Sequence, residues 1–139
     1  MCRGCRRVAP LDPRRAVDVG GRVEQILHVA AANVNFIKLI GGNCALGCAT
    51  PPPKLDPKPT GKAAIIKALG DSYDYGTTLL NQQTSDSILE PVKAPPFMGG
   101  MVSRSRIVSF LNEHAWDVYG QMVVYLRLNG KVPPASQRP

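Results

Sequence analysis

Two histidines carry the clearest chemical potential in this sequence. His28 and His114 are its only histidines, and each lies in a segment whose apolar residues recur at helical spacing. An imidazole in that setting can bind a transition-metal ion, but it more often occupies a core position in which its hydrogen bonds are satisfied. The residue types alone therefore leave a metal-ligand and a structural interpretation open.

Four cysteines form two pairs, Cys2-x-x-Cys5 and Cys44-x-x-x-Cys48. Their spacing is loosely similar to that of a zinc site. The first pair, however, lies in a Pro/Arg-rich segment with no predicted hairpin to orient it, and the second pair brackets three residues of an apolar turn. We therefore expect four reduced thiols in the cytosol and no zinc finger.

Positive charge is concentrated near the start of the chain. The sequence has 17 Lys and Arg against 10 Asp and Glu, a net charge of +7. Six of the arginines and two of the aspartates fall within residues 1–22, which leaves the rest nearly balanced. An arginine-rich segment can bind phosphates without sequence preference, but this one has no aromatic residue to stack on a base. We expect no specific nucleic-acid partner.

Three long stretches have the apolar periodicity of α-helices. Residues 22–40 contain no Pro or Gly, and their apolar positions step by three or four. The same pattern recurs over about 60–83 and about 103–128, and nothing alternates with period two over more than a few residues. This periodicity predicts an all-α fold of three long amphipathic helices, because it places an apolar stripe on each one.

Glycine, asparagine and hydroxyl residues mark where these helices should begin and end. Gly41 begins a Gly-Gly pair that should end the first helix. Thr60 is a candidate N-cap of the second helix, and Ser103 should open the third. Asn129-Gly130 should close the third helix, since glycine readily takes the left-handed conformation that ends a helix.

Proline and glycine also separate the helices. Five prolines within 51–59 forbid helix in the first linker. Residues 84–102 hold three prolines and two glycines. That length predicts a long crossover loop before the last helix, because short loops force neighbouring helices to be antiparallel. We therefore expect one helical domain over 22–136, with an Arg/Pro/Gly-rich, disordered tail at 1–21 and a short tail at 137–139.

Neither a membrane segment nor a secretory signal is expected. No uninterrupted run of about 18 apolar residues occurs. The first twenty residues contain no apolar stretch of the kind that a secretory signal needs. The sequence thus predicts a soluble, cytoplasmic protein without a membrane partner.

Two of the helical segments resemble the signature helices of a known superfamily. Residues 24–33 read EQILHVAAAN, and residues 112–134 read NEHAWDVYGQMVVYLRLNGKVPP. Both are similar to the DinB/YfiT-like superfamily, the second over its whole Tyr-Gly-Gln, Tyr-Leu-Arg, Gly and Pro-Pro series. The stretch SYDY at 72–75 also fits the third helix of that family. The resemblance covers about residues 22–136.

The resemblance implies a four-helix bundle in which three histidines bind a divalent metal ion such as zinc, nickel or iron. His28 and His114 occupy two of the family's ligand positions, whereas the third is Val118, which has no lone pair to donate. Asp117 is a candidate substitute, although Asp117 and Glu113 otherwise belong to a solvated helix edge. Two imidazoles alone hold a metal weakly, so we favour a structural or vestigial histidine pair over a bound catalytic ion.

The family's first helix has no counterpart in the sequence. Family members begin with another amphipathic helix, whereas residues 1–21 have no sustained apolar period. The first of the four helices is therefore missing or replaced. Two explanations stay open: a truncated or misassigned start, which we favour, and a natural tail with a targeting role.

Two functions from different classes follow. The resemblance implies a metal-dependent thiol transferase or hydrolase-type enzyme, in which the ion lowers the pKa of a small-molecule thiol or of water. The alternative is a non-catalytic helical-bundle protein that forms a homodimer through the groove left open by the missing helix. The sequence does not identify the substrate or the metal, nor does it fix the oligomeric state.

Overall fold

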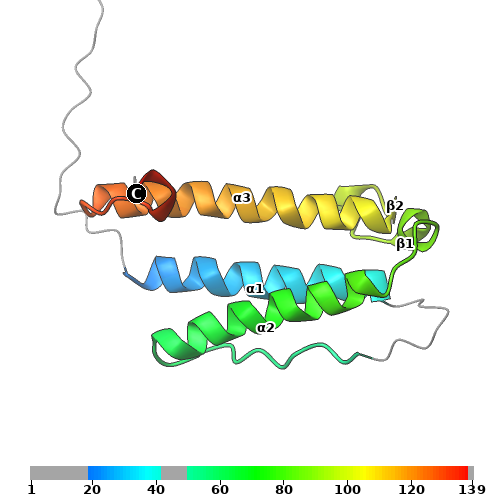
Figure 1. Ribbon diagram of the computed structural model, residues 1–139, viewed down its shortest axis with the longest axis horizontal. Helices are drawn as coiled ribbons and strands as arrows, with labels where there is room; N and C mark the ends of the chain where they lie inside the picture. Colours follow the sequence, from blue (N-terminus) through cyan, green and yellow to red (C-terminus); the bar gives the residue numbers. More distant parts are fainter. Residues whose placement is uncertain (1–18, 42–49, 138–139) are drawn as a thin grey trace, which may run out of the picture.

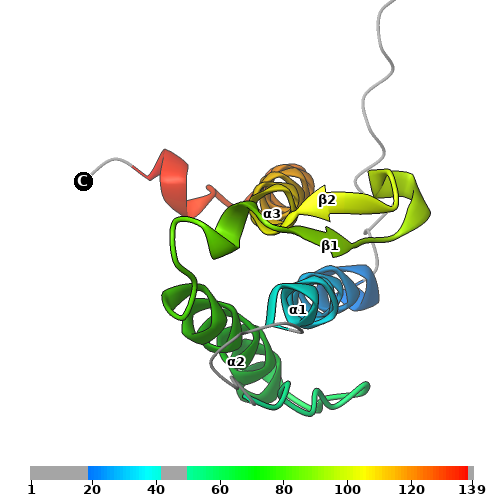
Figure 2. The same ribbon diagram turned by 90° about the vertical axis from the view of Figure 1, so that its right-hand side faces the viewer.

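The computed structural model describes residues 19–41 and 50–137 and is mostly helical. Its three long helices are α1 (Val19–Gly41), α2 (Lys62–Asn81) and α3 (Arg104–Leu128). Figure 1 shows that α1 and α2 run parallel and that α3 runs antiparallel to both. Figure 2, an end-on view, shows that α1 lies between the other two helices, which make few contacts with each other. The described residues thus form a bent three-helix layer with α1 at the bend.

The helix boundaries agree with the sequence signals at most ends. The Ser103 hydroxyl oxygen accepts a hydrogen bond of 3.3 Å from the backbone N–H of Arg106, as expected of an N-cap. Asn129 follows the last residue of α3, and Gly130 has a φ of 66°. Thr60 was the wrong choice of N-cap for α2. Gly61 occupies that position with a φ of 85°, a backbone conformation that favours glycine.

The predicted start of the first helix is three residues too late. Helix α1 begins at Val19, so residues 19–21 belong to it and not to a disordered tail. The glycine pair at 20–21 does not stop the helix. The remainder of the expected tail, residues 1–18, lies outside the described residues, as does the second glycine expected to end α1.

Of the segments that join consecutive helices, the one from α1 to α2 runs the length of the layer. Residues 50–61 run back along α2 to its first residue, which is why α1 and α2 are parallel (Figure 1). The predicted crossover loop at 84–102 instead stays at one end of the layer. It passes from α2 over the end of α1 to α3, and it therefore joins two antiparallel helices. The prolines of both segments keep them out of the helices, as expected.

The prediction of an all-α class is confirmed, since the described residues are mostly helical, although the segment between α2 and α3 also contains a small β-hairpin. Strands β1 (Pro91–Lys93) and β2 (Met101–Ser103) pair antiparallel, with Val92 opposite Val102. The 3₁₀ helices η1 (Ser87–Leu89) and η2 (Pro96–Met98) precede and interrupt the hairpin, and η3 (Pro134–Ser136) follows α3. A three-residue strand is too short to show a period of two, so the sequence pattern could not reveal it.

The hydrophobic core lies at the hairpin end of the layer. Its buried members come from all three helices and from the hairpin: Ile37, Ile40, Tyr75, Leu79, Val92, Ala94, Ile107 and Leu111. Burial raises the pKa of the Tyr75 phenol. Beyond Leu111, the only buried residue of α3 is Val118. The opposite end of the layer is consequently more open.

Arg104 joins the hairpin end of the layer to the end of α1. Its side chain is 2% exposed, and its Nε donates a hydrogen bond of 3.1 Å to the backbone oxygen of Ile40. One terminal nitrogen donates hydrogen bonds of 2.6 Å to the Ser87 backbone oxygen and to a carboxylate oxygen of Glu90. The guanidinium thus satisfies a carbonyl at the end of α1 and another in η1.

Candidate functional site

His28 and His114 lie side by side across the interface of α1 and α3. Their ring centroids are 4.9 Å apart, and the rings meet edge to face at 79°. The prediction that the two imidazoles approach each other is therefore confirmed. His28 is exposed and His114 is half-buried, so the pair is reachable from solvent.

The histidine pair ends an aromatic row that sequence reasoning missed. His114 stacks on Phe110, with the rings 1° from parallel and their centroids 6.0 Å apart. Phe110 also contacts Phe36 at 5.0 Å and Phe97 at 5.8 Å. The row links η2 to the histidines along the α1–α3 interface. Helical spacing places Phe110 one turn before His114, but the sequence gives no signal that Phe36 and Phe97 join them.

An open groove of about 470 Å³ surrounds the pair. Helix α1 contributes Glu24, Gln25 and His28, and α3 contributes His114, Asp117, Val118, Gln121 and Tyr125. Val118 faces this groove although it is only 5% exposed. The position that the family resemblance assigns to a third ligand therefore does belong to the same site, one helical turn after His114.

Carboxylates border the groove without completing a metal site. Asp117 lines it and accepts a hydrogen bond of 3.0 Å from the Gln121 amide. Glu24 lines it from α1, one turn before His28, and was not considered from the sequence. Glu113 instead pairs with Arg106 at 3.4 Å. Within residues 19–41 and 50–137, no group of three or more His, Cys, Asp or Glu side chains is placed to hold a metal ion. The imidazoles of His28 and His114 are thus the side chains in this groove that offer nitrogen ligands to a metal ion.

The four cysteines and the arginine cluster cannot be placed relative to this groove. Cys2, Cys5, Cys44 and Cys48 lie outside the described residues, and so do five of the six arginines within 1–22. The expectation that no zinc finger forms therefore remains a prediction.

Comparisons with known proteins do not identify a family. No protein-family model, curated protein or solved structure matches this chain. The resemblance to the DinB/YfiT-like superfamily remains a prediction from the sequence. No helix in the described part of the chain is long and apolar enough to cross a membrane.

Proposed function

We propose that this chain is a DinB-like helical-bundle protein in which His28 and His114 bind one divalent transition-metal ion. The observation that supports the proposal is the 4.9 Å separation of the two imidazole rings in a groove open to solvent. Neutral imidazole is a common ligand of zinc, nickel and iron. With two protein ligands, the ion binds weakly and exchanges readily, and water completes its coordination.

The open groove suits a small-molecule thiol as the reacting partner. A bound divalent ion lowers the pKa of a coordinated thiol or water, which supplies a nucleophile at neutral pH. The chain's own contribution is to orient the two imidazoles through the aromatic row and to admit the partner through the open side. Asp117 and Glu24 line the groove, so their carboxylates are available to accept the proton that the thiol or water gives up. The proposal keeps the cytoplasmic location expected from the sequence.

Metal binding should be visible as a thermal shift that depends on both histidines. We expect Ni²⁺ or Zn²⁺ to raise the melting temperature of the wild-type protein and to have no effect on His28→Phe or His114→Phe. Phenylalanine keeps an aromatic ring at each position, against Phe110 in His114→Phe and against His114 in His28→Phe, but removes the nitrogen donor, so the apo proteins should remain folded. The measurement is a pair of melts for each protein, with and without the ion.

The same melts also separate this site from the cysteines. All four thiols are kept in both variants, so a metal-induced rise that survives both substitutions would place the ion elsewhere and contradict the proposal. Identical melts of the wild-type protein with and without metal would contradict it too. Equilibrium dialysis against Ni²⁺ gives an independent readout, because it detects a weakly bound ion: the proposal requires binding that saturates near one ion per chain in the wild-type protein and is lost in both variants.

Self-association is a second candidate function, favoured by exposed apolar side chains on α3. Trp116 is 66% exposed and meets Tyr119 edge to face at 5.8 Å. Val124 and Leu128 are 55% and 47% exposed further along the helix. Exposed apolar residues that gather on one element are characteristic of an interface between proteins.

Solution mass decides whether the chain forms a homodimer. If it does, Trp116→Glu should shift the protein to monomer at micromolar concentration, because a buried charge without a partner opposes association. Ser109→Glu introduces the same charge on another exposed position of α3 and serves as the control. A metal-free wild-type dimer that Trp116→Glu dissociates and Ser109→Glu does not would favour this candidate. A wild-type protein that is already monomeric would exclude it.

A further inference from the structure

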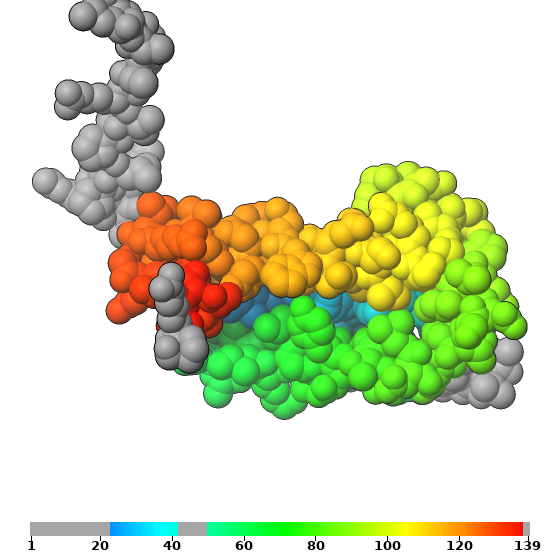
Figure 3. Space-filling model, turned by 45° about the horizontal axis from the view of Figure 1, so that its top comes forward, coloured from blue at the N-terminus to red at the C-terminus, as the bar shows by residue number. Residues whose placement is uncertain are grey.

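A second cavity lies where the three helices face one another. Its volume is about 170 Å³, and its lining residues come from α1, α2 and α3. Figure 3 shows a hollow between α2 and α3, with α1 visible at its floor. The histidine pair and Val118 do not line this cavity, so it is separate from the groove described above.

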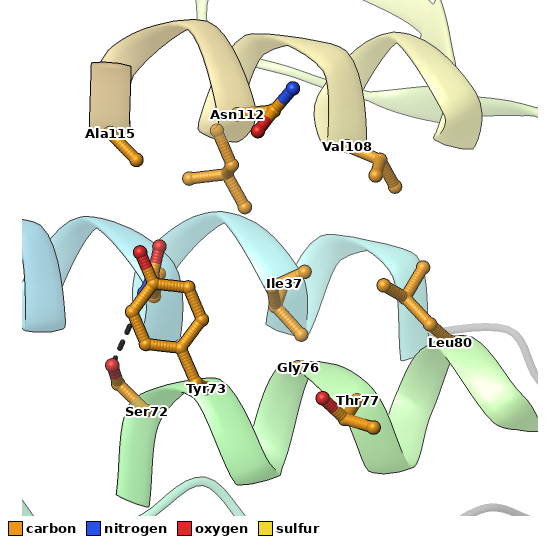
Figure 4. Close-up of a pocket in the computed structure, with 11 residues that line it drawn as sticks. Ile37, Ser72, Tyr73, Gly76, Thr77, Leu80, Val108, Asn112 and Ala115 are labelled. Atoms are coloured by element: carbon orange, nitrogen blue, oxygen red, sulfur yellow. Dashed lines mark hydrogen bonds between the residues drawn. The ribbon is translucent and has the colours of Figure 1, made fainter. Parts of the chain in front are cut away.

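Apolar side chains form most of the cavity wall. They come from all three helices: Ile37, Leu80, Val108, Leu111 and Ala115. Figure 4 shows Ile37 on the α1 side, with Val108 and Ala115 opposite on α3. Gly76 leaves room on the α2 side, where a Cβ would lie 3.6 Å from Ile37 Cγ1. The absent side chain of Gly76 therefore helps to keep the space open.

One buried polar side chain, that of Asn33, borders this apolar space. Asn33 lines the cavity, is only 6% exposed and donates a hydrogen bond of 3.2 Å from Nδ2 to the Ser72 hydroxyl oxygen. Ser72 gives its own hydrogen to the Leu69 backbone oxygen at 2.7 Å. The hydroxyl can therefore only accept from Asn33, which fixes the orientation of the amide.

The fixed amide leaves the Asn33 oxygen as a free acceptor. No donor within the described residues reaches Oδ1. Oδ1 is nevertheless not completely shielded from solvent, and Asn33 is one of the residues that line the cavity. A donor group on a ligand can replace the water that this oxygen would otherwise contact, and in apolar surroundings that hydrogen bond is stronger than in bulk water.

We propose that this cavity binds a small ring compound that carries one hydrogen-bond donor, such as a phenol. The size is appropriate, because an apolar cavity of about 150 Å³ accommodates benzene. The ring lies between the apolar side chains of the three helices, and its hydroxyl donates to Asn33 Oδ1. Tyr73 stands at the mouth with its hydroxyl pointing toward α3 (Figure 4). This site does not depend on the proposed metal binding.

Titration with phenol, followed by the amide NMR signals of the protein, tests the proposal. We expect saturable shifts at millimolar phenol in the parts of α1, α2 and α3 that line the cavity. Toluene has the same size without a donor and gives the reference affinity. In Asn33→Leu, the affinity ratio of phenol to toluene should fall about tenfold, the effect of one hydrogen bond.

A pair of glycine variants keeps the test decisive if Asn33→Leu fails to fold. Gly76→Leu places a side chain in the cavity and should abolish phenol binding. Gly70→Leu makes the same change on the same helix, where a Cβ meets nothing within 4 Å, and should leave binding intact. Equal phenol affinities of both variants, or the absence of saturable wild-type shifts, would overturn the proposal. Unchanged phenol selectivity in a folded Asn33→Leu would overturn the role of the amide oxygen.

Discussion

Arg104→Met should lower the free energy of unfolding by about 2–4 kcal/mol, as measured by urea denaturation. Methionine fills much of the same buried space but has no donor. The backbone oxygens of Ile40 and Ser87 would each lose a charge-assisted hydrogen bond. Because Arg104 is 2% exposed, water cannot easily replace these donors.

Glu90→Gln separates the contribution of the ion pair to the free energy of unfolding from that of the two carbonyl contacts. The Glu90 side chain is 59% exposed, so its pairing with Arg104 is partly screened by solvent. Glu90→Gln should therefore cost less than about 1 kcal/mol. Arg104→Lys keeps the charge but loses the planar set of donors, and we expect an intermediate loss. If Glu90→Gln and Arg104→Met were equally destabilising, the ion pair would be the dominant contribution and the argument from the carbonyls would be wrong.

Val118→His should create a third metal ligand in the groove that already holds His28 and His114. Val118 lines that groove, and its position one turn after His114 places two imidazoles on one face of α3. Val118 is 5% exposed, so in the absence of metal the substitution should cost about 1–3 kcal/mol from lost burial and an added polar group. The apo variant should accordingly melt at a lower temperature than the wild-type protein.

Metal should then return this stability. A ligand that binds only the folded state stabilises it by about 2.7 kcal/mol when its free concentration is a hundredfold above the dissociation constant. We therefore expect Ni²⁺ or Zn²⁺ to raise the melting temperature of Val118→His by more than that of the wild-type protein. Val124→His is the matched control, since Val124 is 55% exposed on the same helix and does not line the groove.

The outcomes of these melts bear directly on the inferred ligand geometry. Equal metal-induced rises in Val118→His and the wild-type protein would mean that the added imidazole does not reach the ion. An equal rise in Val124→His would mean that surface histidines bind metal without the groove. No rise in any of the proteins would show that the arrangement inferred from the family does not hold here.

The sequence by itself determined where the helices lie. Apolar spacing of three and four residues located all three helices, and Ser103 and Asn129-Gly130 marked two of their ends correctly. These signals are local, because a cap or an apolar stripe depends on residues within a turn or two. The family resemblance of residues 24–33 and 112–134 also predicted that His28, His114 and Val118 lie close together, and all three line one groove.

The tertiary structure alone decided how those helices are arranged and what they enclose. Periodicity reports which face of a helix is buried but not which element covers it, so it did not reveal that α1 and α2 are parallel. The bond from Arg104 to Ile40 and the bond from Asn33 to Ser72 join residues 64 and 39 positions apart. Such contacts form only when distant segments pack, and they determine both the buried arginine and the cavity acceptor. The aromatic row depends in the same way on η2 being brought back over the α1–α3 interface.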